Sequence, residues 1–160
     1  MRCILCLSVT LLVTGQATDT LQVFVVEKNV PYADGGDEQM LDLYRPAKKG
    51  FTTIVFTYGG GWHSGSRNSD APIGQSLVKL GYGCALISHR LAPKYKFPAQ
   101  AEDVAAAFAW IKKNIEAKGG DPKRIVLMGH SSGAHLSLLI ATDPKFLAVQ
   151  SSRPLTLPRW

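Results

Sequence analysis

Residues 125–133 read Ile-Val-Leu-Met-Gly-His-Ser-Ser-Gly, an apolar run that passes directly into the pattern Gly-x-Ser-x-Gly. The run is typical of a buried strand, and the apolar residues that follow it are typical of a helix. The pattern therefore predicts a sharp strand-to-helix turn that exposes the hydroxyl of Ser131 through a strained backbone conformation. Gly129 and Gly133 stand where small residues let strand and helix approach each other. The amide of Ser132 would lie at the helix N-terminus, where it can donate to a developing oxyanion.

A second glycine pattern, Tyr-Gly-Gly-Gly-Trp at residues 58–62, follows the run Thr-Ile-Val-Phe at residues 53–56. Acyl-transfer sites of this kind take one oxyanion donor from the residue after the nucleophile and another from a glycine-rich loop after an earlier strand. Glycines let the backbone approach a substrate oxygen without a Cβ in between. Two such turns, in this order and each after its own strand, favour a nucleophilic serine site over two ordinary turns.

With these motifs, the chain resembles the α/β-hydrolase family, in the branch that contains hormone-sensitive-lipase-like esterases, feruloyl and acetyl-xylan esterases, and kynurenine formamidases. The resemblance runs from about Leu41 to Leu147, with the motifs in family order. The stretches that carry it are residues 58–62 (YGGGW), 88–93 (SHRLAP), 97–100 (FPAQ) with Asp103, 120–122 (GDP) and 129–135 (GHSSGAH). It implies an α/β fold, a three-layer sandwich around a mostly parallel sheet, and carboxylesterase activity.

The resemblance also implies the roles of particular residues. Ser131 would be the nucleophile, and the amides of Gly60, Gly61 and Ser132 would form the oxyanion hole. One departure is visible, because the glycine loop of the family usually opens with His and this chain has Tyr58 there. A phenol can also form the hydrogen bond that holds a loop in place.

The catalytic acid and base of such a site are not found in this sequence. In this fold a triad runs Ser, then Asp or Glu, then His, with the last two on loops after later strands. No histidine follows His135, which lies only four residues after Ser131 and is interpreted as structural. We therefore expect residues 18–149 to be the N-terminal part of a hydrolase domain, truncated after the nucleophile helix. Residues 150–160 have neither helical nor strand periodicity and are left unassigned.

Three functions are compatible with these motifs. The first is a serine hydrolase that cleaves carboxylic esters, either small molecules or esters linked to polysaccharides. The second is an amidase or peptidase on the same fold, because fold and elbow do not decide which bond is cleaved. The third is a non-catalytic fragment or interaction module, a possibility raised by the missing base. The glycine loop favours the ester hydrolase.

Composition restricts the partners and cofactors. The chain has 160 residues, enough for one domain, and 46% hydrophobic residues, as expected of a folded core. Its formal charge is +6, but the lysines are dispersed and not interleaved with aromatics, so nucleic-acid binding is not expected. No cofactor or metal is expected, because the histidines lack metal-ligand spacing and no phosphate-binding glycine loop is present. The oligomeric state is not determined by the sequence.

The N-terminus predicts the compartment. Arg2 precedes an apolar stretch at residues 4–13, and residues 15–17 (Gly-Gln-Ala) resemble a cleavage site. Residues 1–17 are therefore interpreted as a signal peptide of a secreted or periplasmic protein, too short to span a membrane. Removing that segment would leave Cys84 as the remaining cysteine, in a run typical of a buried strand, so we expect a packed thiol.

The remaining elements follow from periodicity and from turn residues. We expect an alternation of strands and helices, which calls for a sheet covered on both faces. The expected strands are residues 21–26, 39–44, 52–57, 82–88 and 125–128, the expected helices are residues 72–80 and 99–117, and a turn is expected at residues 34–37.

Overall fold

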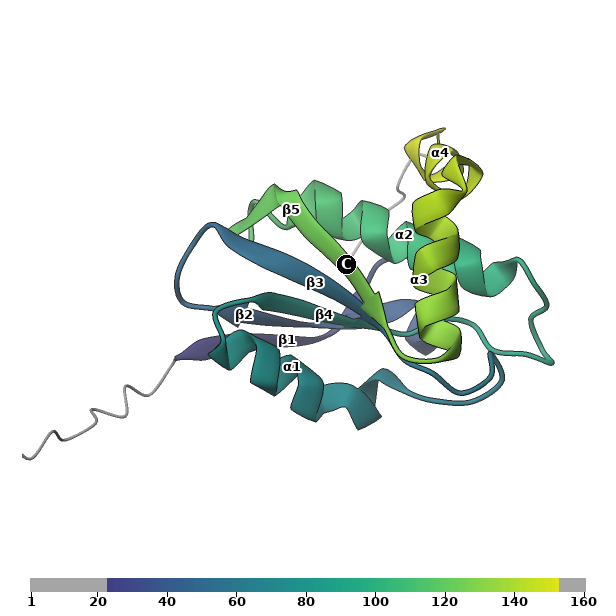
Figure 1. The fold of residues 1–160 in the computed structure, drawn as a ribbon, viewed down its shortest axis with the longest axis horizontal. Coiled ribbons are helices and arrows are strands. Elements are labelled where there is room, and N and C mark those ends of the chain that lie inside the picture. Colours follow the sequence, from purple (N-terminus) through teal and green to yellow (C-terminus); the bar gives the residue numbers. More distant parts are fainter. Residues whose placement is uncertain (1–22, 153–160) are drawn as a thin grey trace, which may run out of the picture.

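The computed structural model describes residues 23–152 (Figure 1). In chain order the elements are β1 (Phe24–Pro31), the 3-10 helix η1 (Gly36–Gln39), β2 (Met40–Pro46), β3 (Phe51–Thr57), the 3-10 helix η2 (Arg67–Asp70), α1 (Ala71–Lys79), β4 (Gly83–Ile87), α2 (Ala99–Asn114), β5 (Gly120–Gly129), α3 (Ser132–Thr142) and α4 (Pro144–Ser152). The predicted signal peptide at residues 1–17 lies outside the described residues.

The strands form one mixed sheet in the order β1-β2-β4-β3-β5. The last three of these strands are parallel, because β3 pairs in parallel with both β4 and β5. The first two are antiparallel to their neighbours: β1 pairs with β2, and β2 pairs with β4. The predicted α/β fold is confirmed, with its parallel part confined to β4, β3 and β5, of which β3 and β5 lead into the glycine turns.

Helices cover both faces of the sheet, so the three-layer arrangement is confirmed (Figure 1). On one face, α2 and α3 pack over a core of fully buried side chains that includes Leu43, Val55 and Ile111. On the other face, α1 packs over a smaller core around Tyr44 and Leu86. The free thiol of Cys84 lies in this smaller core, where burial raises its pKa to about 12, so the expectation of a packed thiol is confirmed.

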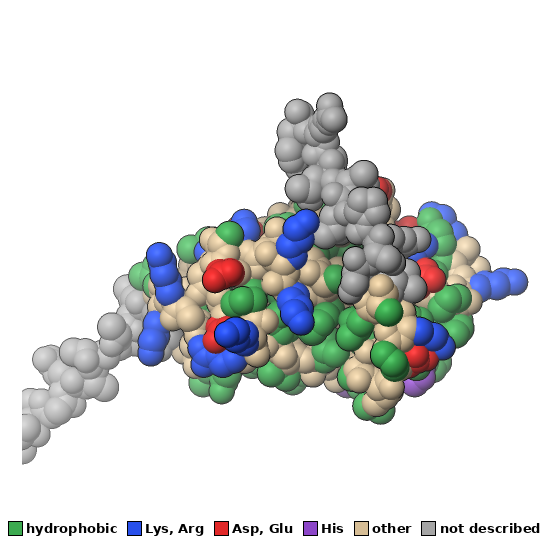
Figure 2. Space-filling view, turned by 90° about the horizontal axis from the view of Figure 1, so that it is seen from above, with side chains coloured by type: hydrophobic (Ala, Val, Ile, Leu, Met, Phe, Trp, Pro, Cys, Tyr) green, Lys and Arg blue, Asp and Glu red, His purple; other side chains and the backbone are tan. Residues whose placement is uncertain are grey.

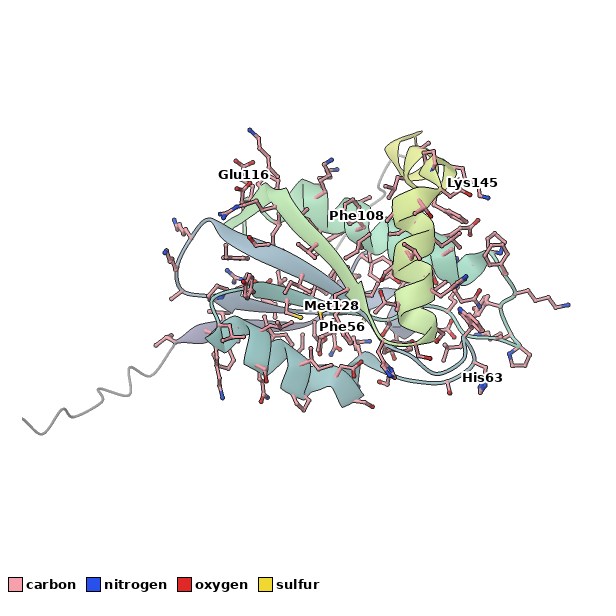
Figure 3. All side chains as sticks on the ribbon, viewed as in Figure 1. Phe56, His63, Phe108, Glu116, Met128 and Lys145 are labelled. Carbon is pink, nitrogen blue, oxygen red and sulfur yellow. The ribbon has the colours of Figure 1, made fainter. Side chains whose placement is uncertain are left out.

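β5 is the strand at one edge of the sheet, and its outer face is partly exposed. Ile125 and Leu127 pack against the larger core, whereas Val126 and Met128 on the opposite face are 49% and 42% exposed. Figure 3 shows Met128 beside its register partner Phe56, which is buried in the smaller core. α1 packs on β4 and β2, and therefore leaves β5 uncovered on this side.

Several predicted boundaries differ from those of the structure. The first strand was expected at residues 21–26 and extends to Pro31, with a bulge between Glu27 and Val30. The elbow strand begins at Gly120 rather than residue 125, because Gly120 already pairs with Phe51. The helix expected at residues 99–117 ends at Asn114.

The C-terminal end of the described residues also differs from the prediction. We left residues 150–160 unassigned, but α4 continues to Ser152, and residues 153–160 lie outside the described part. Asp143 ends α3, and its carboxylate accepts a hydrogen bond from the Lys145 amide at 3.1 Å. Within residues 23–152, no helix has the length and apolar character needed to cross a membrane.

Surface charge is scattered on the face seen in Figure 2. Lys and Arg side chains lie among acidic, hydrophobic and neutral ones rather than in one continuous patch. This distribution agrees with the dispersed lysines of the sequence.

Candidate active site

The Gly-x-Ser-x-Gly turn has the strained geometry that its sequence predicts. Ser131 lies between β5 and α3 with φ 51° and ψ −121°, a conformation that non-glycine residues rarely adopt. A Cβ on Gly133 would lie 2.1 Å from the carbonyl oxygen of Thr57, and one on Gly129 would lie 2.6 Å from the backbone of Gly133. Both glycines are therefore required by close backbone approach. This geometry leaves Ser131 exposed at the tip of the turn.

In the loop after β3, glycine is required first by the backbone angles. Gly60 and Gly61 have φ values of +131° and +61°, in the region that glycine tolerates best. The Gly60 carbonyl accepts hydrogen bonds from the amide of Ser64 at 3.1 Å and from its hydroxyl at 2.9 Å, which close the loop into a tight turn. Trp62 also has a positive φ of 65°, so the loop holds a bulky side chain in a strained conformation.

The fold places the two turns against each other. A Cβ on Gly59 would lie 2.8 Å from His130 Nδ1 and 3.1 Å from Ser131 Cβ. Farther along, the ring of Trp62 meets the ring of His135 edge-on, with 5.4 Å between centroids. The cause is the parallel pairing of β3 with β5, because parallel neighbours end at the same edge of the sheet.

Three backbone amides at this edge are free to donate. Among the described residues, the N–H groups of Gly60, Gly61 and Ser132 have no hydrogen-bond acceptor. Ser132 is the first residue of α3, where the partial positive charge of the helix N-terminus adds to the donor. Free donors beside an exposed serine are the arrangement that stabilises an oxyanion.

No described side chain activates the Ser131 hydroxyl. Within residues 23–148, no imidazole or carboxylate forms a hydrogen bond with that hydroxyl. His135 is one helical turn further on, with its amide bonded to the Ser131 carbonyl and its ring against Trp62, which agrees with a structural role. Figure 3 shows His63 pointing outward from the glycine loop. The described residues also contain no group of three side chains suited to a metal ion.

Tyr58, at the position where the resembled family has His, is buried behind the loop. Its hydroxyl donates to the carbonyl oxygen of His89 at 3.3 Å, and its ring is stacked on the His89 ring with 4.5 Å between centroids. Burial raises the pKa of Tyr58, so the phenol stays protonated and able to donate. The phenol thus holds the start of the loop, as expected from its chemistry.

One buried charge near the loop was missed by the sequence analysis. Arg67, 7% exposed, forms an ion pair with the 1% exposed Asp42 at 3.1 Å and also donates to the Ser88 hydroxyl at 2.6 Å. Arg67 lies just after the glycine loop, while its partners come from β2 and from the end of β4. No local pattern marks Arg67, because its partners are 25 and 21 residues away in the sequence.

Comparison with known proteins identifies the family of this arrangement. The family model BD-FAE matches residues 41–152, which include both glycine turns. The chain belongs to the BD-FAE family of α/β-hydrolase esterases. This result confirms the resemblance inferred from the motifs, and it covers the N-terminal part of such a domain.

Relatives of this BD-FAE chain are esterases by name. Esterase LipQ of Mycobacterium tuberculosis is 35% identical over 76% of this chain and 30% of its own length. Carboxylesterase NlhH of the same species is 31% identical over 73% of this chain and 37% of its own length. The chain therefore spans about a third of the length of these curated relatives.

Solved structures agree with the sequence relatives. A truncated carbohydrate esterase from gut microbiota is 35% identical, with a TM-score of 0.66 over 71% of this chain and 41% of that protein. Esterase B from Lactobacillus rhamnosis is 26% identical, with a TM-score of 0.71 over 83% of this chain and 44% of that protein. The BD-FAE chain thus matches less than half of each of these structures.

Proposed function

We propose that this BD-FAE chain carries the nucleophile and oxyanion hole of a carboxylic ester hydrolase. Ser131 attacks the carbonyl carbon of the ester, and the amides of Gly60, Gly61 and Ser132 stabilise the negative charge that develops on the carbonyl oxygen. The substrate class is a carboxylic ester, either a small molecule or an ester linked to a polysaccharide.

The observation that carries this proposal is the contact between the two glycine turns. The exposed, strained Ser131 lies beside three amides without acceptors, and Gly59 brings the loop within van der Waals reach of the serine. Backbone strain at an exposed polar residue is costly and is kept where the residue has a functional role. The names of the related esterases support the same chemistry.

The proposed reaction needs a general base and an acid from outside residues 23–152. A serine hydroxyl is a weak nucleophile until a base accepts its proton. No described residue occupies that position, since His135 is turned to Trp62. Oxyanion stabilisation and binding alone would still allow a residual rate, about 10³–10⁴ over water.

The test is the hydrolysis of short-chain aryl esters, and of matched aryl amides, by the purified full-length protein that also supplies the base and the acid. Ser131→Ala should lower ester turnover by about 10³-fold or more. Ser76→Ala is the matched control, because this exposed serine of α1 donates only to the Pro72 carbonyl. Full turnover in Ser131→Ala would overturn the assignment of the nucleophile.

The same measurements separate the alternatives. Faster cleavage of the amide than of the ester would favour an amidase on the same fold. The absence of any Ser131-dependent turnover on either substrate would favour a non-catalytic protein, the third possibility left open by the motifs.

A further inference from the structure

The glycine loop is attached at both of its ends to the segment that follows β4, residues 88–92. At the first end, Tyr58 is 5% exposed and stacks on His89, with an angle of 20° between the ring planes. At the other end, the amide of Ala92 donates to the carbonyl oxygen of Trp62 at 2.9 Å. The residues between these two attachments are Gly59, Gly60 and Gly61. Because glycine has no side chain, no side-chain contact of their own can fix their positions.

Residues 88–92 are themselves held by three separate elements. The Ser88 carbonyl accepts a hydrogen bond from the Tyr32 hydroxyl at 2.6 Å, and the Ser88 hydroxyl accepts one from Arg67 at 2.6 Å. The guanidinium of Arg90 contacts the carboxylate of Asp103 on α2 through hydrogen bonds of 2.8 to 3.0 Å. The side chain between these anchors is His89, so the surface on which Tyr58 stacks belongs to a rigid part of the fold.

The His89 ring is oriented for this contact rather than for chemistry. The residue is 2% exposed, and its Nδ1 lies 3.0 Å from the Arg90 carbonyl oxygen, so Nδ1 carries the proton and donates. Its Nε2 is buried and has no partner among the described residues. Burial lowers the pKa of His89, and the ring is therefore neutral at pH 7.

We propose that Tyr58 and His89 form a positioning pair that fixes the direction of the Gly60 and Gly61 amides. The inference rests on the proposed function, because it assigns the pair a role in oxyanion stabilisation. Both side chains are buried. Glycine loses more conformational freedom on ordering than any other residue. The hydrogen bonds from Ser64 hold only the Gly60 carbonyl, so the three glycines depend on further support to present fixed donors. Preorganised donors are what make an oxyanion hole effective, because they do not reorganise during the reaction.

The geometry separates the stack from the hydrogen bond. The Tyr58 hydroxyl donates to the His89 carbonyl at 3.3 Å and accepts from the His89 amide at 3.5 Å, and both hydrogen bonds are long. The two rings, in contrast, are stacked with 4.5 Å between centroids. The stack should therefore contribute more to loop order than the hydroxyl. Tyr58→Phe keeps the stack and removes the hydroxyl, while Tyr58→Leu and His89→Leu remove the stack from either side.

The test combines a measurement of loop order with kinetics. Backbone ¹⁵N relaxation gives order parameters for Gly60 and Gly61, which should fall from about 0.85 to below about 0.6 in Tyr58→Leu and His89→Leu. Ester turnover should show a fall in kcat of up to about 10²-fold with KM changed less than about threefold, because the donors act on the transition state. Tyr58→Phe should keep ordered glycines and lose less than about tenfold in kcat. The double variant Tyr58→Leu/His89→Leu should lose no more than either single one.

The matched control is Tyr44→Leu. Tyr44 is a buried tyrosine, 2% exposed, in the smaller core between α1 and the sheet. Its removal should lower the melting temperature while leaving the glycine order parameters and kcat unchanged. A stability loss by itself is thereby distinguished from a loss of positioning.

Each result decides between the two proposals. Order parameters that fall no further in Tyr58→Leu than in Tyr44→Leu would overturn the positioning pair, as would disordered glycines with unchanged kcat. Disordered glycines in a protein that has no Ser131-dependent turnover would leave the pair supported as the anchor of the loop and overturn the proposed ester hydrolase instead.

Discussion

The two glycine turns lie at the same edge of the sheet, yet they are held by different contacts. In the turn after β5, Gly129 and Gly133 are required because backbone atoms fill the space of a side chain. In the turn after β3, Gly60 and Gly61 have positive φ values, and a Cβ on Gly60 would also meet the backbone of Ser64. Residues 88–92 hold this loop from outside. The serine turn is therefore built by close backbone packing, between β5 and α3 at Gly129 and between α3 and the end of β3 at Gly133. The amide loop depends on contacts with a segment about 30 residues away.

The largest effect should follow from a Cβ in the serine turn. In Gly133→Ala the added methyl group would lie 2.1 Å from Thr57 O and 2.3 Å from Tyr58 O, both backbone atoms. Alanine usually stabilises a helix relative to glycine by about 0.5–1 kcal/mol. Here the clash should reverse that sign and destabilise the protein by about 3 kcal/mol or more, measured by urea unfolding.

Gly81→Ala is the control for this prediction. Gly81 has φ +88° with no atom within 4 Å of an added Cβ. Gly81→Ala should therefore lower the free energy of unfolding only through backbone strain, by about 1–2 kcal/mol. An equal loss in both variants would mean that the serine turn can open to admit a side chain, contrary to the close packing described above.

A smaller effect is expected in the amide loop, where two neighbouring glycines should respond differently. A Cβ on Gly60 would lie 2.1 Å from the backbone oxygen of Ser64, whereas one on Gly61 would meet only the ring of the exposed His63 side chain, at 3.1 Å. Urea unfolding should give a loss of about 2 kcal/mol for Gly60→Ala and about 1 kcal/mol for Gly61→Ala. The loop lies at the surface, so both losses should be smaller than that of Gly133→Ala. Equal losses at the two positions would contradict a cost set by the Ser64 contact.

The smallest expected effect is a change in the pH dependence of stability. Burial, the largest cause, lowers the pKa of His89 in the folded protein below its ordinary value of 6.5, while the Arg90 hydrogen bond and the Asp103 charge oppose the shift. The unfolded chain therefore binds a proton more tightly than the folded one. Stability should be highest above pH 6.5 and should fall as the pH drops through 6.5 toward the folded-state pKa.

This prediction is checked by the free energy of unfolding at pH 7 and pH 5. The difference between the two values should shrink in His89→Phe, which keeps an aromatic ring against Tyr58 and cannot titrate. It should be retained in His63→Gln, since His63 is exposed. An unchanged difference in His89→Phe would mean that other groups account for the loss of stability in acid.

Much of the parallel part of the fold could be predicted from the sequence, because its signals are local. The strands 52–57 and 82–88 were expected within one residue of β3 and β4. The helix 72–80 was expected within one residue of α1. The N-terminal strand was placed less well, because its bulge and its pairing with β2 decide how far it runs.

By itself, the sequence determined the serine turn. Its glycines, its serine and its helix start stand within a stretch of five residues, so their spacing alone was sufficient to predict the turn. The space that Gly133 leaves free is filled by the backbone of Thr57 and Tyr58, which the motif does not contain. Only the tertiary structure decided what supports the facing loop. The Tyr58–His89 stack and the Arg67–Asp42 ion pair join residues 31 and 25 positions apart, and such contacts depend on which strands become neighbours. Strand order is set by burial over the whole sheet, which no short motif encodes.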